Sequence, residues 1–349
     1  MIKKFSEAIN EALDLSMRKD KKVILMGLGV DDPKRIFGTT KNLLEKYGYN
    51  RVFDVPTAEN GMMGIAIGIS IEGFKPIICH QRVEFSLLAM EQIINQAAKW
   101  NYMFAGTMSV PLVIRLIIGK GWGQGPQHSQ SLESIFAHIP GLKIISPSNA
   151  YDAKGLLISS IEDKNPVIFF EHRWLHQTTG KVPKKYYKIP IGKAKVLKKG
   201  KDITLVSNSI MTLECIKSAK ILDGYGIKVE IIDLRSLRPL DKKTIIKSVK
   251  KTHKLLVIDN GWKQYGISAE IMSSVSESLS DKINLSTKRL GLADIPIPST
   301  RSLADLCYPN YLNICETVGK ILHKKLKNIK MIKNDIPSDQ PDKNFIGPF

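Results

Sequence analysis

The sequence lacks the features that would place it in a membrane, secreted or zinc-binding class. It has no run of about 18 consecutive apolar residues, the length that a transmembrane helix needs. Its first residues lead into an amphipathic pattern without the apolar core of a signal peptide. The four cysteines have neither CxxC nor His-linked zinc spacing and are too few for a disulfide framework. We therefore expect a cytoplasmic protein with no membrane partner.

The short motifs of several common enzyme classes are also missing. There is no Walker loop, no GxGxxG after a strand, no HExxH and no GxSxG. Lys and Arg (52) outnumber Asp and Glu (33), which gives a net charge of +19, but no basic patch is interleaved with aromatic residues. We interpret the charge as a solvated, lysine-rich surface and expect no nucleic-acid partner. A non-catalytic nucleic-acid-binding scaffold is the alternative, and it predicts salt-sensitive binding.

What the sequence does contain is an alternation of strand-like and helix-like segments, interrupted once. The pattern includes a strand over 76–83, a long amphipathic helix over 86–100 and a continuously aliphatic strand over 110–118. A Lys-rich stretch then precedes a second alternation, and Lys, Asn, Pro and Asp accumulate at the end. We predict a doubly wound α/β domain over 1–190, a linker over 191–201, a second α/β domain over 202–326 and a mobile tail over 327–349.

Two loops at predicted strand ends, where open α/β sheets bind ligands, carry candidate catalytic groups. Glu59 stands where a strand gives way to a glycine-rich helix, and a favourable interaction with the helix dipole would also account for it. His128 lies in a loop with four glycines, residues 119–130, a length that usually indicates function. Because the pKa of histidine is near neutrality, His128 is a candidate general acid or base.

Two further loops carry candidate anion-binding groups. If the strand over 76–83 is regular, His80 and Arg82 share one face and could together hold a carboxylate or phosphate. An ion pair between these residues and Glu84 would explain them equally well. The loop 171–176 combines acidic, basic and aromatic side chains, which we interpret as structural. The residue patterns alone thus predict a two-domain α/β protein and name no reaction.

Seven segments together resemble a known family. They are Arg51–Gly61, Glu91–Lys99, Gly125–Gln130, His138–Ile144, Ser146–Leu156, Asp233–Asp241 and Leu256–Trp262. In this order, over roughly residues 5–325, they resemble the beta subunit of the first component of thiamine-diphosphate-dependent 2-oxo acid dehydrogenases (pyruvate, branched-chain and acetoin types), within the transketolase-like group. The resemblance implies a pyrimidine-binding domain followed by the transketolase C-terminal domain.

The resemblance also implies roles for individual residues. Glu59 matches the glutamate that hydrogen-bonds the aminopyrimidine ring of thiamine diphosphate and activates it, and Phe85 matches the aromatic residue beside that ring. His128 matches the histidine that faces the 2-oxo acid and steers acyl transfer to a lipoyl group. Some relatives bind potassium, and the matching positions here are Leu112, Ser160, Ile161, Asp163 and Asn165.

The partners follow from a signature that is absent. The diphosphate–magnesium signature of the family, which lies on its alpha subunit, is not in this sequence. The resemblance therefore implies an α₂β₂ heterotetramer, with a lipoylated acyltransferase as a further partner. The segment with His80 and Arg82 departs from many relatives. If Arg82 points into the site, the substrate is expected to carry an extra anionic group or to be otherwise unlike pyruvate. A two-chain transketolase-like or acyloin-forming enzyme without a lipoyl acceptor is the alternative.

Overall fold

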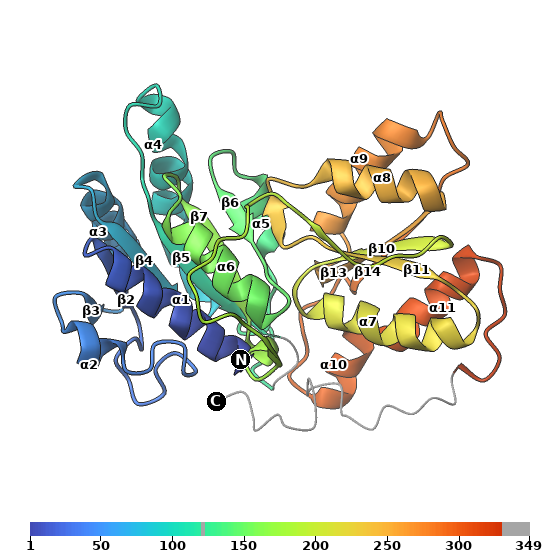
Figure 1. The fold of residues 1–349 in the computed structure, drawn as a ribbon, viewed down its shortest axis with the longest axis horizontal. Coiled ribbons are helices and arrows are strands. Elements are labelled where there is room, and N and C mark those ends of the chain that lie inside the picture. The colour runs from blue at the N-terminus through green and yellow to red at the C-terminus, as the bar shows by residue number, and fades with distance from the viewer. Residues whose placement is uncertain (120–122, 330–349) are drawn as a thin grey trace. The chain divides into compact units, whose positions relative to one another are not determined.

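The computed structural model describes residues 1–119 and 123–329, which form two compact units (Figure 1). The first unit contains residues 1–119 and 135–191, and the second contains residues 123–134 and 192–329. The loop that carries His128 therefore belongs to the second unit, although it lies between two segments of the first in sequence. No helix in these described ranges is long and apolar enough to cross a membrane.

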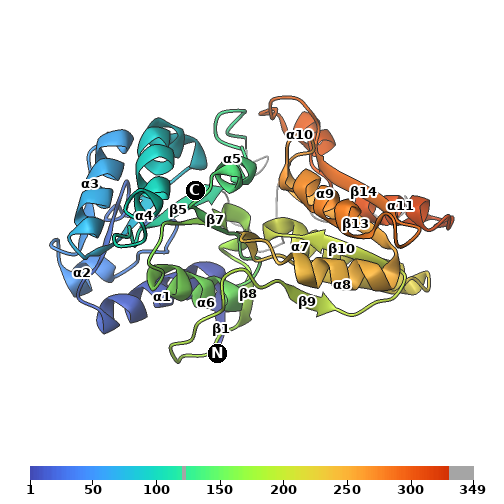
Figure 2. The same ribbon diagram turned by 90° about the horizontal axis from the view of Figure 1, so that it is seen from above.

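The first unit is built on a parallel sheet whose strands run in the order β6-β7-β5-β4-β2-β3. The strands are β2 (Val23–Gly27), β3 (Val52–Asp54), β4 (Lys75–His80), β5 (Val113–Ile118), β6 (Lys143–Ile145) and β7 (Val167–His172). Helices α1 (Phe5–Lys19) and α6 (Ala150–Ile161) cover one face, and α3 (Glu59–Ile71) and α4 (Ala98–Met103) cover the other (Figure 2). Burial on both faces accounts for the aliphatic strands.

Smaller elements complete the first unit. Strands β1 (Ile2–Lys4) and β8 (Thr179–Lys181) pair antiparallel. The short helices are α2 (Leu43–Tyr47), the 3₁₀ helices η1 (Val83–Ala89) and η3 (Arg173–Leu175), and the π-helix η2 (Gln92–Ala97). Helix α5 (Glu133–His138) belongs to this unit from residue 135 onward. Helix α6 begins at a conventional cap, because the Asn149 side chain accepts a 2.9 Å hydrogen bond from the Asp152 N–H.

Two predictions for the segment after β4 are wrong. The predicted strand over 76–83 ends at His80, and the predicted helix over 86–100 is a succession of η1, η2 and α4. The Ser86 hydroxyl donates a 2.6 Å hydrogen bond to the Val83 carbonyl, which closes the tight turn that follows the strand. Arg82 lies beyond the strand, so the period-two argument that placed it on one face with His80 does not apply. Helical segments of changing pitch are common near functional sites.

The second unit has a five-stranded sheet in the order β14-β13-β10-β11-β9. Strands β10 (Ile203–Ser207), β11 (Val229–Asp233), β13 (Lys254–Trp262) and β14 (Ser286–Leu292) are parallel, and β9 (Lys195–Lys198) pairs antiparallel with β11. Helices α7 (Ser209–Gly224) and α11 (Tyr311–Ile321) lie on one face, and α8 (Lys242–Thr252) and α9 (Ile267–Leu279) on the other (Figure 1). The predicted α/β class is thereby confirmed.

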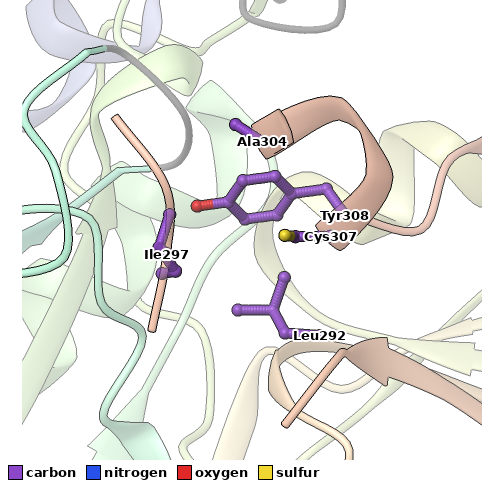
Figure 3. Packing of buried hydrophobic residues seen from close by; sticks show 5 residues of the cluster. All are labelled: Leu292, Ile297, Ala304, Cys307 and Tyr308. Carbon is purple, nitrogen blue, oxygen red and sulfur yellow. The ribbon is translucent and has the colours of Figure 1, made fainter. Parts of the chain in front are cut away.

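The remaining elements of this unit are β12 (Ser236–Arg238) and α10 (Arg301–Cys307). A small apolar core packs α10 near the end of β14 (Figure 3). Trp262 is partly buried against this core. Its members are Leu292, Ile297, Ala304, Cys307 and Tyr308. Strand β9 is formed by residues of the stretch predicted to be a linker. Most of the predicted mobile tail, residues 330–349, lies outside the described residues.

Candidate functional site

Glu59 is the first residue of α3 and follows strand β3 after a short loop. Its side chain is buried, with 6% of the residue exposed. Asp54, at the end of β3, accepts hydrogen bonds from the N–H groups of Gly29 (2.9 Å) and Val30 (2.6 Å) and so ties this edge of the sheet to the loop after β2. A carboxylate in the first turn of a helix interacts favourably with the helix dipole. Glu59 is therefore a buried acid held at the carboxyl end of the sheet.

Phe85 lies in η1, the element that packs against α3. Its side chain is half-buried, and Ser86 beside it fixes the turn. The structure thus brings the elements that carry Glu59 and Phe85 together in one unit, at the same edge of the sheet. An acid and an aromatic ring are the two groups that a planar, protonatable ring system needs for hydrogen bonding and stacking.

His80 and Arg82 differ in charge at neutral pH. Burial lowers the pKa of His80 to about 4, so this ring is neutral at pH 7 and adds no positive charge. Burial also lowers the pKa of Arg82, to about 10, but leaves the guanidinium charged at pH 7. The second positive charge beside Arg82 comes instead from Arg173, the first residue of η3 after β7.

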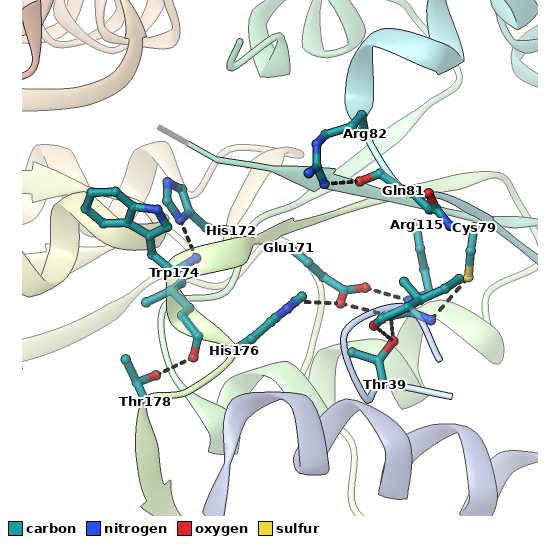
Figure 4. A network of polar contacts seen from close by, with 12 residues as sticks. Thr39, Cys79, Gln81, Arg82, Arg115, Glu171, His172, Trp174, His176 and Thr178 are labelled. Atoms are coloured by element: carbon teal, nitrogen blue, oxygen red, sulfur yellow. Dashed lines mark hydrogen bonds and ion pairs between the residues drawn. The ribbon is translucent and has the colours of Figure 1, made fainter. Parts of the chain in front are cut away.

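Beneath these residues a polar network is centred on Arg115 of β5 (Figure 4). Its guanidinium forms a bidentate ion pair with Glu171 of β7, with Nε–Oε1 and Nη2–Oε2 distances of 2.5 and 2.9 Å. Nη1 donates to Cys79 Sγ at 3.1 Å and Nη2 to Thr39 Oγ1 at 2.9 Å. Nε2 of His176 lies 3.3 Å from the second Glu171 oxygen.

The network is wholly buried, with both Arg115 and Glu171 0% exposed. Burial raises the pKa of Glu171, but the charge of Arg115 and the hydrogen bonds of His176 and Arg115 outweigh it and hold the pKa at about 2. Burial raises the pKa of the Cys79 thiol to about 11, so the thiol is protonated at pH 7. The pair is therefore a charged, fully satisfied anchor between neighbouring strands.

His128 lies in the second unit, where its loop is fixed to the end of β13. Asn260 Nδ2 donates a 2.6 Å hydrogen bond to Ser131 Oγ. Burial, and then the charge of Asp259, raise the pKa of Glu133 to about 8 at the end of the same loop. Nδ1 of His128 lies 2.9 Å from the Gln127 carbonyl oxygen, so Nδ1 carries the proton and the basic lone pair of a neutral ring is on Nε2.

The residues predicted to bind potassium lie around the turn after α6 and just before β5. The Leu112 carbonyl accepts from the Val167 N–H at 2.9 Å, and the Ser160 carbonyl from the Asp163 N–H at 3.2 Å. Asp163 also pairs with Lys143 at 2.5 Å. Among the described residues, no three His, Cys, Asp or Glu side chains are grouped to hold a metal ion. A site of carbonyl oxygens stays a prediction.

Comparison with known proteins identifies the family. Residues 3–178 match the family model "Transketolase, pyrimidine binding domain", and residues 192–313 match "Transketolase, C-terminal domain". The chain is 41% identical over 324 residues to the pyruvate dehydrogenase E1 component subunit beta, mitochondrial, of Pisum sativum, covering 92% of this chain and 90% of the relative. The chain belongs to the family of 2-oxo acid dehydrogenase beta subunits.

Other members and a solved structure extend this result. The beta subunit of acetoin:2,6-dichlorophenolindophenol oxidoreductase from Bacillus subtilis is 39% identical over 335 residues, covering 93% of this chain and 98% of the relative. A solved "split gene transketolase, inactive beta4 tetramer" has a TM-score of 0.76 at 23% identity, covering 92% of this chain and 99% of that one. The predicted resemblance and the predicted transketolase-like fold of the beta-subunit family are thus confirmed.

Sequence reasoning missed the importance of two arginines. Arg115 was available as a signal, because a charged residue inside the aliphatic segment 110–118 must find a buried partner. Arg173 belongs to a loop that we interpreted as structural, and it comes close to Arg82 only because separate loops meet at the edge of the sheet. The spacing of residues along the chain predicts neither the Arg115–Glu171 pair nor the proximity of Arg173 to Arg82.

Proposed function

We propose that this chain is the beta subunit of a heteromeric thiamine-diphosphate-dependent 2-oxo acid dehydrogenase, which decarboxylates a 2-oxo acid and transfers the acyl group to a lipoyl carrier. The observation that supports this most directly is the placement of Glu59. It is a buried acid at the start of α3, inside the segment that matches the pyrimidine-binding domain, with Phe85 on the adjacent element.

The residues present fit the aminopyrimidine of the cofactor, because that ring needs a buried acid for hydrogen bonding and an aromatic side chain for stacking. Thiamine diphosphate, when bound, supplies a thiazolium carbon that acts as a nucleophile and stabilises the charge left by decarboxylation. Glu59 holds a proton at the ring nitrogen, and Phe85 fixes the ring plane. His128 moves a proton through Nε2. We assign magnesium and the diphosphate of the cofactor to the alpha subunit. We assign potassium to carbonyl oxygens around the turn after α6 and just before β5.

The lipoyl acceptor separates this function from the alternative. With a lipoylated carrier present, the alpha–beta complex is expected to release carbon dioxide from a 2-oxo acid continuously and to acylate the carrier. A two-chain acyloin-forming or transketolase-like enzyme would instead turn over with an aldehyde or sugar acceptor and ignore the carrier. The distinction is measured by carbon dioxide release and by the mass of the carrier, with each acceptor supplied in turn.

Replacing His128 with Ala is expected to impair acyl transfer to the lipoyl carrier about 100-fold or more, and to impair decarboxylation less. The reason is that the sulfur that leaves when the lipoyl S–S bond breaks must receive a proton, so this step needs a general acid, and protonated His128 would donate that proton from Nε2. Single-turnover decarboxylation and carrier acylation, measured separately, give the two rates. Equal losses in both steps would contradict the assignment of His128 to the transfer step.

An exposed apolar patch on the first unit is the proposed contact for the alpha subunit. It spans α3, η1 and α4: α3 packs against η1 and η2, and α4 packs against η2. Its most exposed large members are Ile65, Leu87, Leu88, Tyr102 and Met103. A Cβ added at Gly61 or Gly68 of α3 would meet no atom within 4 Å, so the helix backbone is open to close approach. A patch of this kind favours a protein partner, and family membership favours the alpha chain.

Leu88→Glu is therefore expected to weaken assembly with the alpha chain at least 10-fold, because 66% of Leu88 is exposed in this patch and a charge there would be buried on binding. Copurification with a tagged alpha chain and size-exclusion chromatography measure the loss. Tyr49→Glu is the matched control, since Tyr49 is 68% exposed and lies between α2 and β3, outside these three elements. Normal assembly of the Leu88→Glu chain would place the interface elsewhere.

The proposed location of the protein in the cell is the cytoplasm, although the pea relative is named mitochondrial.

A further inference from the structure

The loop after β2 contains a strained segment. Arg35, Ile36 and Phe37 have φ values of 49°, 45° and 57°, which places three consecutive non-glycine residues in the left-handed region. This backbone conformation is unfavourable for a non-glycine residue, most of all for the β-branched Ile36, and persists only where the surroundings hold it. Strain of this kind is concentrated at ligand-binding and catalytic sites. The conformation fixes the position of Phe37.

The surroundings that hold this segment are the Arg115 network. Thr39 donates a hydrogen bond from Oγ1 to the Ile36 carbonyl at 2.9 Å and accepts one from Arg115 at 2.9 Å on the same oxygen (Figure 4). On the inner side, the ring of Phe37 packs against His176, with centroids 5.9 Å apart. His176 is in turn beside Glu171. The Arg115–Glu171 pair thus supports the segment in two ways: Arg115 holds it through Thr39, and Glu171 holds it through His176, which contacts the Phe37 ring.

Two guanidinium groups lie against Phe37. Cζ of Arg173 is 4.4 Å from the ring centroid, and Cζ of Arg82 is 5.4 Å from it. We call Arg82 and Arg173 the arginine pair. They follow β4 and β7, which lie on either side of β5, so both come from the carboxyl edge of the same parallel sheet. This is the edge at which open α/β sheets bind ligands, and Glu59 begins α3 at the same edge.

The arginine pair is a concentrated positive charge with little water around it. Only 7% of Arg82 and 3% of Arg173 is exposed. Burial, and then the charge of Arg82, lower the pKa of Arg173 to about 10, so the two groups repel each other yet both remain charged at pH 7. Glu84 attracts Arg82 and offsets part of this charge. His80, also buried, is neutral at pH 7 and offsets none. Such a pair interacts most favourably with an added anion.

We propose that the arginine pair binds a second anionic group of the substrate, a carboxylate or phosphate at the end remote from the 2-oxo carboxylate. The preferred substrate is then an acidic 2-oxo acid rather than pyruvate. Phe37 contacts both guanidinium groups, and Arg82 Nη1 also donates a 2.8 Å hydrogen bond to the Gln81 carbonyl. Arg side chains have five N–H donors each, and their fork matches carboxylate and phosphate oxygens. This inference rests on the proposed function, because it names the substrate class of the same site.

Matched substrates test it in the assembled alpha–beta complex. Each 2-oxo acid of four to six carbons with a terminal carboxylate is compared with its terminal amide, which has the same shape and no charge, and with the terminal phosphonate. The wild-type complex is expected to have a kcat/KM at least 10-fold higher for an anionic member than for the amide. Arg82→Gln and Arg173→Gln are each expected to lower that value by about 10- to 100-fold and to change the value for the amide by less than 3-fold.

Further variants keep the test decisive if a Gln variant folds poorly. Arg82→Lys and Arg173→Lys keep the charge and lose the fork, so partial retention of the preference is expected. Arg18→Gln is the control, since Arg18 is 62% exposed on α1. Calorimetric titration of the complex with glutarate and with its monoamide reads binding without turnover, and glutarate is expected to bind at least 10-fold more tightly to the wild type.

Different results would overturn the role of the arginine pair and the proposed function. A wild-type complex that shows no preference for the anionic acids, or Gln variants that lose activity equally on the acid and its amide, would overturn the role of the arginine pair and leave the proposed function standing. Absence of thiamine-diphosphate-dependent turnover with every 2-oxo acid would overturn the proposed function itself. A preference that is present in the wild type and lost in both Gln variants would support both.

Discussion

Replacing Glu59 with Gln is expected to lower cofactor-dependent turnover of the alpha–beta complex by about 100- to 10,000-fold, the range over which a positioned acid contributes to catalysis. Gln has nearly the same size and still forms a hydrogen bond, but it cannot share a proton with the ring nitrogen of the aminopyrimidine. The loss is therefore expected in kcat rather than in assembly. Steady-state decarboxylation measures it, with size-exclusion chromatography to establish that the complex forms.

Glu72→Gln is the matched control for this prediction. Glu72 caps the opposite end of α3 and is exposed, so the same substitution removes a charge from the same helix without touching the buried acid. Its turnover is expected to be within about 3-fold of the wild type, as for most surface substitutions. Full activity of the Glu59→Gln complex would show that another group activates the cofactor.

Replacing Arg115 with Met is expected to reduce the free energy of unfolding by about 3–5 kcal/mol. The substitution leaves the carboxylate of Glu171 charged and buried with its bidentate partner gone, and it frees Thr39 from its hydrogen bond. The double variant Arg115→Met/Glu171→Met is expected to recover most of this loss, because apolar side chains of similar volume often replace a buried pair without cost. Urea titration measures all three proteins.

Lys19→Met is the control, since Lys19 pairs with Glu162 in solvent and is 57% exposed. Exposed pairs contribute at most about 1 kcal/mol. The pH dependence is a second readout. The pKa of Glu171 is held at about 2 in the folded chain, below its unfolded value, so the pair's stabilisation is present above pH 4.5 and is lost as the pH falls towards 2. The difference between wild type and Arg115→Met should narrow in that window. A difference independent of pH would contradict the charge argument.

Periodicity predicted most of the scaffold from the sequence. The aliphatic segment 110–118 contains β5, and the glycine-rich segment 58–71 contains α3 almost to the residue. Strand β5 is buried along its whole length, and the buried residues of α3 recur at helical spacing, so the pattern and length of each segment indicate its type. The segment 81–97 was not predictable in this way, because a tight turn after His80 and changes of helical pitch depend on side-chain hydrogen bonds such as that of Ser86.

The same distinction holds for the candidate site: local sequence patterns predict one part of it, and long-range contacts determine the other. Glu59 could be found because a strand, a short loop and a helix follow one another in sequence. The arginine pair could not, because Phe37, Arg82 and Arg173 come from three loops that meet only when the strands are ordered as they are in the sheet. Left-handed backbone at three consecutive non-glycine residues has no sequence signal either. Long-range contacts between loops carry the information that local patterns lack.

The central claim is tested most directly by carbon dioxide release from a panel of 2-oxo acids with the two chains expressed together. Release is expected to require both chains, thiamine diphosphate and magnesium, and to be abolished by Glu59→Gln. Release by the beta chain alone, or release by the complex that is unchanged when thiamine diphosphate is withheld, would contradict it.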